Sequence, residues 1–130
     1  MNLNVEKILI IGLGMIGSSI ALASKSKGIK VYGFDKSNNS IKEALEKNII
    51  DSKVESIEDI NSKDFVKKVD LIIVAVSPKQ TLDVLNNLKD IWNTDVTITD
   101  TSSVKNHIKL NGASNIVLSH PIAGSDQSGI

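Results

Sequence analysis

Residues 7–17 read KILIIGLGMIG, a short apolar run that leads directly into three glycines. The run Lys7–Ile11 is continuous and rich in β-branched side chains, which is typical of a strand buried on both faces of a parallel sheet. The glycines fit the pattern G-x-G-x-x-G, and apolar residues at helical spacing continue from Ile16 to Lys27. A strand, this glycine pattern and a helix, in that order, predict a binding site for a dinucleotide.

Each glycine of the pattern has a separate physical task. Gly12 allows the tight turn, Gly14 lets the backbone approach a pyrophosphate, and Gly17 lets the helix pack closely on the strand. The start of the helix offers free N–H groups and the positive end of its dipole to the phosphates. We therefore expect Met15 and Ile16, in its first turn, to contact the cofactor as well.

The second predicted strand, Lys30–Asp35, ends in an acidic residue about 20 residues after the glycines, where a dinucleotide site has its acid. The carboxylate of Asp35 is placed to accept hydrogen bonds from the 2′-hydroxyl of the adenosine ribose. It would repel a 2′-phosphate, so NAD is favoured over NADP. The neighbouring Lys36 argues the other way, because a lysine can pair with a phosphate.

The rest of the chain alternates strands with helices. We predict further strands at 70–76, 96–99 and 115–119, a short one around Val54 and Ile57, and helices at 41–47 (capped by Ser40 or the asparagines before it), 63–68, 78–92 and 104–110. This alternation predicts a Rossmann-type, doubly wound α/β fold: a mainly parallel sheet with helices on both faces. In that fold Val76 and Ser77, at the end of the strand 70–76, line the cofactor site.

Composition bounds the remaining possibilities. The chain has 130 residues, no cysteine, and 15 lysines balanced by 15 acidic residues, with no arginine. This excludes disulfides and thiolate metal sites, and we predict no metal. Zero net charge argues against a nucleic-acid partner, and no apolar stretch approaches a membrane span or a signal peptide, so a cytoplasmic location is expected.

Two polar stretches follow the fifth and sixth predicted strands. Residues 99–105 read TDTSSVK and residues 119–129 read SHPIAGSDQSG. Ligands of open α/β sheets bind at the carboxyl ends of strands, where both stretches lie. Together with GLGMIGSS at 12–19, they make the chain resemble the prephenate dehydrogenase family, which includes enzymes that use arogenate. The resemblance covers residues 1–130 but only the nucleotide-binding half of the family's architecture.

The resemblance implies a reaction and its catalytic residues. The family oxidises and decarboxylates prephenate to 4-hydroxyphenylpyruvate, a step towards tyrosine. His120 corresponds to the base that takes the proton of the substrate hydroxyl as hydride leaves for the nicotinamide, which suits an imidazole near neutral pH. Ser103 corresponds to the serine that bridges the hydroxyl, the histidine and the nicotinamide, so it is expected in both the catalytic and the cofactor-binding sets.

The sequence departs from the family's pattern near the substrate. Ser102 stands where the family usually has glycine, and Ser125-Asp126-Gln127 stands where Thr-Glu-Lys is usual. Ser102, Ser125 and Asp126 are the residues expected to contact the substrate. The family binds its dianionic substrate partly with arginine from a helical domain, so this chain alone should bind cofactor but bind prephenate poorly.

The C-terminal residues 119–130 are rich in loop formers and no closing helix follows them. We therefore expect residues 1–130 to be one dinucleotide-binding domain, the N-terminal part of a longer protein. The resemblance implies that a helical domain follows, that it completes the substrate site, and that a homodimer forms through it.

The sequence is also compatible with other functions. The enzyme could use arogenate, or it could be another small-acid dehydrogenase, such as one of the β-hydroxyacid group, which shares the glycine pattern. A non-catalytic dinucleotide-binding or sensing module would need the glycines and Asp35 but would have no use for His120 or Ser103. An enzyme of either kind acts on a small-molecule substrate, whereas a sensing module has none.

Overall fold

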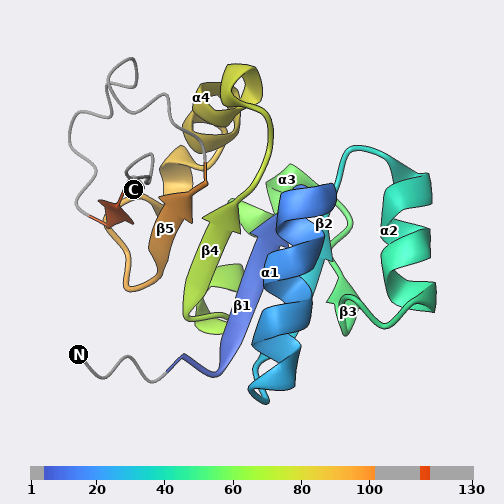
Figure 1. The fold of residues 1–130 in the computed structure, drawn as a ribbon. Helices are drawn as coiled ribbons and strands as arrows, with labels where there is room; N and C mark the ends of the chain where they lie inside the picture. The colour runs from blue at the N-terminus through green and yellow to red at the C-terminus, as the bar shows by residue number, and fades with distance from the viewer. Residues whose placement is uncertain (1–4, 102–114, 118–130) are drawn as a thin grey trace, which may run out of the picture.

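A computed structural model describes residues 5–101 and 115–117. Its six strands are all parallel and form one sheet in the order β3-β2-β1-β4-β5-β6 (Figure 1). This order confirms the predicted doubly wound fold. The elements are β1 (Lys7–Ile11), α1 (Met15–Ser26), β2 (Lys30–Phe34), α2 (Asn38–Glu46), β3 (Ser52–Lys53), α3 (Ile57–Ile60), η1 (Phe65–Lys67), β4 (Leu71–Val74), α4 (Pro78–Asn86), η2 (Lys89–Ile91), β5 (Thr97–Asp100) and β6 (Ile116–Val117).

The order of the strands reverses beside β1. From β1 the chain first builds outward through β2 and β3, then returns to place β4 on the other side of β1. Ile11, the last residue of β1, pairs with Phe34 in β2 and with Val74 in β4, so three strands end at the same level. The loops that follow these strands diverge there, which leaves a crevice at the carboxyl end of the sheet.

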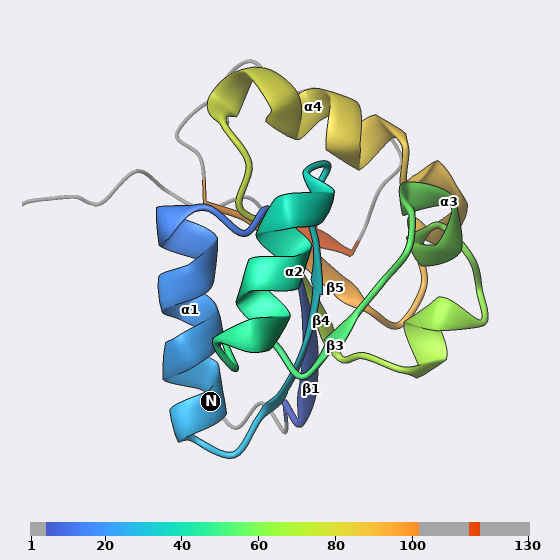
Figure 2. The same ribbon diagram turned by 90° about the vertical axis from the view of Figure 1, so that its right-hand side faces the viewer.

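Helices cover both faces of the sheet (Figure 2). The helix α1 lies against one face and α3 against the opposite face, while α4 runs across the end at which the strand arrows point. Within the described part of the chain, no helix has both the length and the apolar character that crossing a bilayer requires.

The apolar strands form the core, as their composition predicts. Ile8, Leu9, Ile10 and Ile11 are at most 2% exposed, because β1 is covered by helices on both faces. Full burial of each such side chain contributes about 1.5–3 kcal/mol. This interior holds the ends of β1 and β4 rigidly beneath the crevice.

The third strand differs from the prediction. It is Ser52–Lys53, whereas Val54 lies just beyond it and Ile57 begins α3. The hydroxyl of Ser56 accepts a hydrogen bond from the N–H of Asp59 at 3.1 Å, which caps that short helix. The prediction gave weight to the apolar residues and missed this local capping signal.

Other boundaries shift as well. The helix predicted at 63–68 is only the 3-10 turn Phe65–Lys67, and the one predicted at 78–92 ends at Asn86 before a second such turn. The helix predicted at 41–47 begins at Asn38, and its cap is Ser37, whose hydroxyl accepts from the N–H of Ser40 at 3.2 Å. The helix predicted at 104–110 lies outside the described residues.

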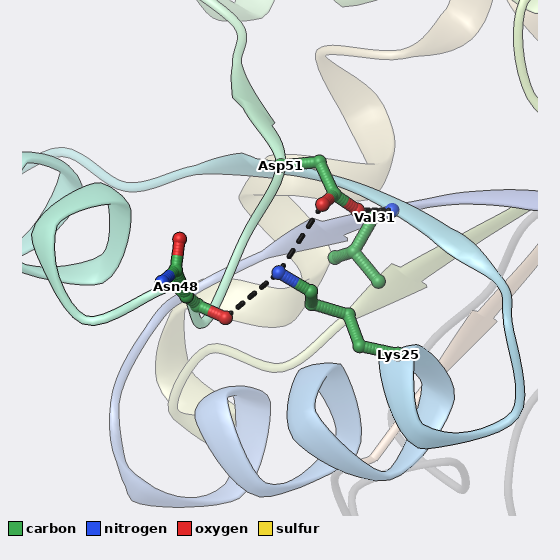
Figure 3. Close-up of polar contacts among 4 residues, drawn as sticks. All are labelled: Lys25, Val31, Asn48 and Asp51. Atoms are coloured by element: carbon green, nitrogen blue, oxygen red, sulfur yellow. Dashed lines mark hydrogen bonds and ion pairs between the residues drawn. The ribbon is translucent and has the colours of Figure 1, made fainter.

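A polar cluster ties α1 to the edge of the sheet (Figure 3). The N–H of Val31 donates to Asp51 at 2.8 Å, and the ammonium group of Lys25 lies 3.1 Å from the same carboxylate. Lys25 also donates to the carbonyl of Asn48 at 2.8 Å. The hydrogen bond from Val31, with help from Lys25, holds the pKa of Asp51 below its ordinary value.

Candidate dinucleotide-binding site

A cleft of 440 Å³ opens at the carboxyl ends of β1, β2 and β4, where the order of the strands reverses. Its volume lies within the range of pockets that bind small molecules and cofactors. The residues that line it are Ile11, Gly12, Gly14, Phe34, Asp35, Lys36, Ile57, Ala75, Val76, Ser77, Gln80, Asp83, Val84 and Asn87.

Gly12 and Gly17 are glycines because the protein itself leaves no room for a side chain. Gly12 has a φ of +103°, and a Cβ there would lie 2.6 Å from the carbonyl oxygen of Ala75. A Cβ on Gly17 would lie 1.9 Å from the carbonyl oxygen of Gly12. Because glycine has no Cβ, the loop can fold tightly over the end of β1, and α1 can pack on that loop.

Gly14 is different, because apart from its two chain neighbours no described residue has an atom within 4 Å of a Cβ built on it. Its φ of −76° is open to any residue, so neither strain nor crowding in the protein requires glycine there. Yet Gly14 lines the cleft, and an added methyl group would occupy the space into which a ligand approaches. The geometry fits the predicted close approach of a pyrophosphate.

The first turn of α1 is open to an anion. Its N-cap is Gly14, which has no side chain to cap the helix, and the turn contains no acidic residue. By contrast, the helices α2 and α3 are capped by the hydroxyls of Ser37 and Ser56. A helix start whose N–H groups lack a side-chain cap is suited to bind phosphate.

Asp35 links the end of β2 to the glycine loop. One carboxylate oxygen accepts the N–H of Leu13 at 2.8 Å, and the other accepts the N–H of Ser37 at 2.9 Å. Each oxygen keeps a further lone pair that can accept a hydroxyl proton. These two hydrogen bonds thus hold the carboxylate in place in the cleft.

The structure brings together part of the predicted site. Gly12, Gly14, Asp35, Val76 and Ser77 line one cleft. Met15 and Ile16 lie in the first turn of α1 with exposed side chains, 88% and 59% respectively, and Gly17 is buried beneath that turn. Ser102, Ser103, His120, Ser125 and Asp126 lie outside the described residues.

The sequence reasoning missed one wall of the cleft. Gln80, Asp83, Val84 and Asn87 line it from α4 and its C-terminal cap, and Ile57 lines it from the start of α3. One signal was available: polar residues recur at positions 80, 83 and 87, three and four residues apart as on one face of a helix, while Thr81 and Leu85 of α4 are buried.

Comparison with known proteins identifies similar chains. A family model described as the nucleotide-binding domain of prephenate dehydrogenase matches residues 20–130. The prephenate dehydrogenase of Lactococcus lactis subsp. cremoris is 37% identical over 96% of this chain, and that of Bacillus subtilis is 34% identical over 100% of it. The chain spans about a third of the length of these curated relatives, 36% in both cases.

Solved structures agree with these sequence matches. The crystal structure of prephenate dehydrogenase from A. aeolicus in complex with hydroxyphenyl propionate and NAD+ has a TM-score of 0.74 and 29% identity, over 99% of this chain and 46% of that one. The Synechocystis arogenate dehydrogenase has the same TM-score, 0.74, at 23% identity, which shows the shared fold.

Proposed function

The chain belongs to the family of prephenate dehydrogenase nucleotide-binding domains, and from that premise we propose that it binds NAD and forms the cofactor half of an enzyme that oxidises prephenate. The observation that carries the proposal is Gly14. It lines the cleft, its Cβ direction is open, and the protein's own packing does not require a glycine there.

Different residues of the cleft would bind different parts of the cofactor. The glycine loop and the start of α1, including the backbone of Met15 and Ile16, would hold the pyrophosphate. Asp35 would accept the hydroxyls of the adenosine ribose, and its charge would oppose a 2′-phosphate. Val76 and Ser77 would line the site from the loop after β4. Bound NAD supplies the acceptor for hydride.

The proposed chemistry at the substrate rests on the family motifs. In the proposal, the imidazole of His120 takes the proton of the substrate hydroxyl, and Ser103 bridges that hydroxyl, the histidine and the nicotinamide. Ser102, Ser125 and Asp126 contribute to the substrate side. The ring becomes aromatic as carbon dioxide leaves. The curated relatives carry the name of this activity, and one further relative, 34% identical, is a cyclohexadienyl dehydrogenase.

The experiment begins with binding and then measures turnover. Isothermal titration calorimetry of the 130-residue chain with NAD and with NADP should show tighter binding of NAD. The native-length gene product should then form NADH when it is given prephenate. Arogenate is supplied in a parallel assay. Turnover with arogenate but not with prephenate would show that arogenate is the substrate. Failure of the chain to bind either dinucleotide would contradict the proposal.

Replacement of His120 distinguishes an enzyme from a sensing module. His120→Asn in the native-length product should lower kcat by about 10²–10⁴-fold, because it removes the general base. The affinity for NAD should stay the same, because the proposed nucleotide contacts lie elsewhere. His107, the other histidine of the sequence, provides the control, His107→Asn, which should leave kcat unchanged. Full activity of His120→Asn would contradict the proposed role.

The proposal also covers location and assembly. A cytoplasmic enzyme is consistent with a chain that has no cysteine and balanced charge. A homodimer is proposed for the native-length product. Size-exclusion chromatography with light scattering tests this, and a monomeric mass would contradict it.

A further inference from the structure

The part of the cleft lined by α3 and α4 has a distinct chemistry. Ile57 lines it from the start of α3, and α4 with its C-terminal cap contributes the apolar Val84 together with the polar Gln80, Asp83 and Asn87. The polar side chains share one helical face, because they lie three and four residues apart. Lys79 is the basic residue of α4, and it is not among the residues that line the cleft.

The order of groups in a dinucleotide identifies what would lie against α3 and α4, and this step rests on the proposed function. With the pyrophosphate at Gly14 and the ribose at Asp35, the base attached to that ribose extends away from the pyrophosphate. Apart from the strand ends and the loops that directly follow them, the cleft is lined by Ile57 and by α4 with its C-terminal cap, which would be left for the base. Apolar Ile57 and Val84 suit the flat faces of a base, while Asp83 and Asn87 suit its polar edge.

We propose that Asp83 sets the specificity of this site for a 6-amino purine, by accepting a hydrogen bond from the exocyclic amino group of adenine. The amide of Asn87, four residues further along the same face, completes the contact with the base edge. A carboxylate can only accept hydrogen bonds. A 6-oxo purine presents an oxygen acceptor at that position, so the carboxylate would repel it.

The surroundings of Asp83 set the expected size of the effect. Asp83 and Asn87 are both exposed at the rim of the cleft. A second cavity of 500 Å³ adjoins the cleft, with which it shares Phe34, Ile57 and Asn87. Water therefore reaches the base edge. The discrimination should lie at the lower end of the range for readout of a base edge, about tenfold.

The experiment compares two dinucleotides that differ only in the base. Isothermal titration calorimetry measures the affinity of the 130-residue chain for NAD and for nicotinamide hypoxanthine dinucleotide, in which oxygen replaces the 6-amino group. The wild-type chain should prefer NAD about tenfold. Asp83→Asn should bring the ratio close to one, because an amide N–H can donate to the 6-oxo group.

A matched variant controls for the change in charge. Asp64 is an exposed aspartate outside the cleft, and its side chain makes no capping hydrogen bond. Asp64→Asn removes the same charge and should leave the ratio at its wild-type value. Thermal melts of both variants confirm that each remains folded.

The possible outcomes separate this inference from the proposed function. If the chain binds NAD but Asp83→Asn leaves the ratio unchanged, the role of Asp83 is overturned while the cofactor assignment survives. Equal affinity of the wild-type chain for both dinucleotides would also overturn the role of Asp83 and leave the cofactor assignment in place. If the wild-type chain binds neither, the proposed function fails and this inference fails with it.

Discussion

The glycines of the motif G-x-G-x-x-G stand at their positions for different physical reasons. Gly12 and Gly17 are required by contacts within the protein, whereas the space around Gly14 is open. Substitution at these positions therefore separates folding from binding.

Gly14→Ala should leave the fold intact and weaken NAD binding. Apart from its two chain neighbours, the methyl group meets no described residue within 4 Å, so the melting temperature should change by only a few degrees. It enters the space of the pyrophosphate, so the Kd for NAD should rise at least about tenfold, which corresponds to about 1.4 kcal/mol. Calorimetry and a thermal melt measure the two effects.

Gly17→Ala provides the contrasting variant. Its Cβ would lie 1.9 Å from a backbone oxygen, so α1 must shift and the free energy of unfolding should fall by about 1–3 kcal/mol or more. A Gly14→Ala chain that binds NAD as tightly as the wild type would contradict the assigned site.

Asp35 should determine the choice between NAD and NADP. Asp35→Asn removes the negative charge, so NAD affinity should fall about tenfold while NADP loses a source of repulsion. The variant also disturbs the hydrogen bonds from Leu13 and Ser37, which should cost about 1 kcal/mol of stability. Titrations with both dinucleotides measure the change in preference.

The neighbouring lysine supplies the control for Asp35. Lys36 also lines the cleft, and Lys36→Gln should weaken NADP binding while NAD binding stays close to that of the wild type. An Asp35→Asn chain with an unchanged preference would show that this carboxylate does not select the cofactor.

At the scale of elements, the contact between α1 and the edge of the sheet depends on charge. Lys25 reaches from the last turn of α1 to Asp51, just before β3, and to the carbonyl of Asn48 (Figure 3). The partners hold the pKa of Asp51 below its ordinary value of 3.8. A carboxylate whose pKa is lowered in the folded state stabilises that state above its unfolded pKa.

Asp51→Asn should therefore destabilise the protein near neutral pH but not in acid. With side chains 24% and 34% exposed, the pair is partly screened by water, and the loss should be about 1 kcal/mol above about pH 5. The difference from wild type should vanish as the pH falls through the lowered pKa, when Asp51 becomes protonated in both states. Denaturant unfolding at several pH values measures it.

An exposed ion pair serves as the comparison for Asp51. Glu43 lies 3.8 Å from Lys47 on the surface of α2, with both side chains at least 60% exposed. Glu43→Gln should change the free energy of unfolding by less than about 0.5 kcal/mol. A loss for Asp51→Asn that persists unchanged at the lowest pH would contradict the electrostatic explanation.

For the whole molecule, binding of the cofactor in the cleft where the order of the strands reverses should stabilise the fold. The cleft joins loops that follow β1, β2 and β4 to α4. NAD at about one hundred times its Kd should add about 2.7 kcal/mol to the free energy of unfolding, which raises the melting temperature by about 10 °C in a chain of this size. Differential scanning calorimetry checks this, and no shift at saturation would contradict cofactor binding by the folded chain.

Much of the fold could be predicted because its signals are local. The run Lys7–Ile11 specifies a buried strand by its own composition, and Gly28, with a φ of +83°, ends the first helix as predicted. The predicted positions of the third strand and of the cap of the second helix were wrong by a few residues. There, one serine hydroxyl, in Ser37 or Ser56, decided where a helix begins.

The amino-acid sequence is enough to predict the order of strands and helices along the chain, the tight turn at Gly12 and the acid at Asp35, because each depends on residues close together in the chain. Tertiary packing was needed to show that the carboxylate of Asp35 accepts the N–H of Leu13, and that Asp83 and Ile57 line one cleft. Those residues lie on separate elements, and the packing of α3 and α4 around the sheet brings them together. Periodicity within one element carries no information about which other element it will meet.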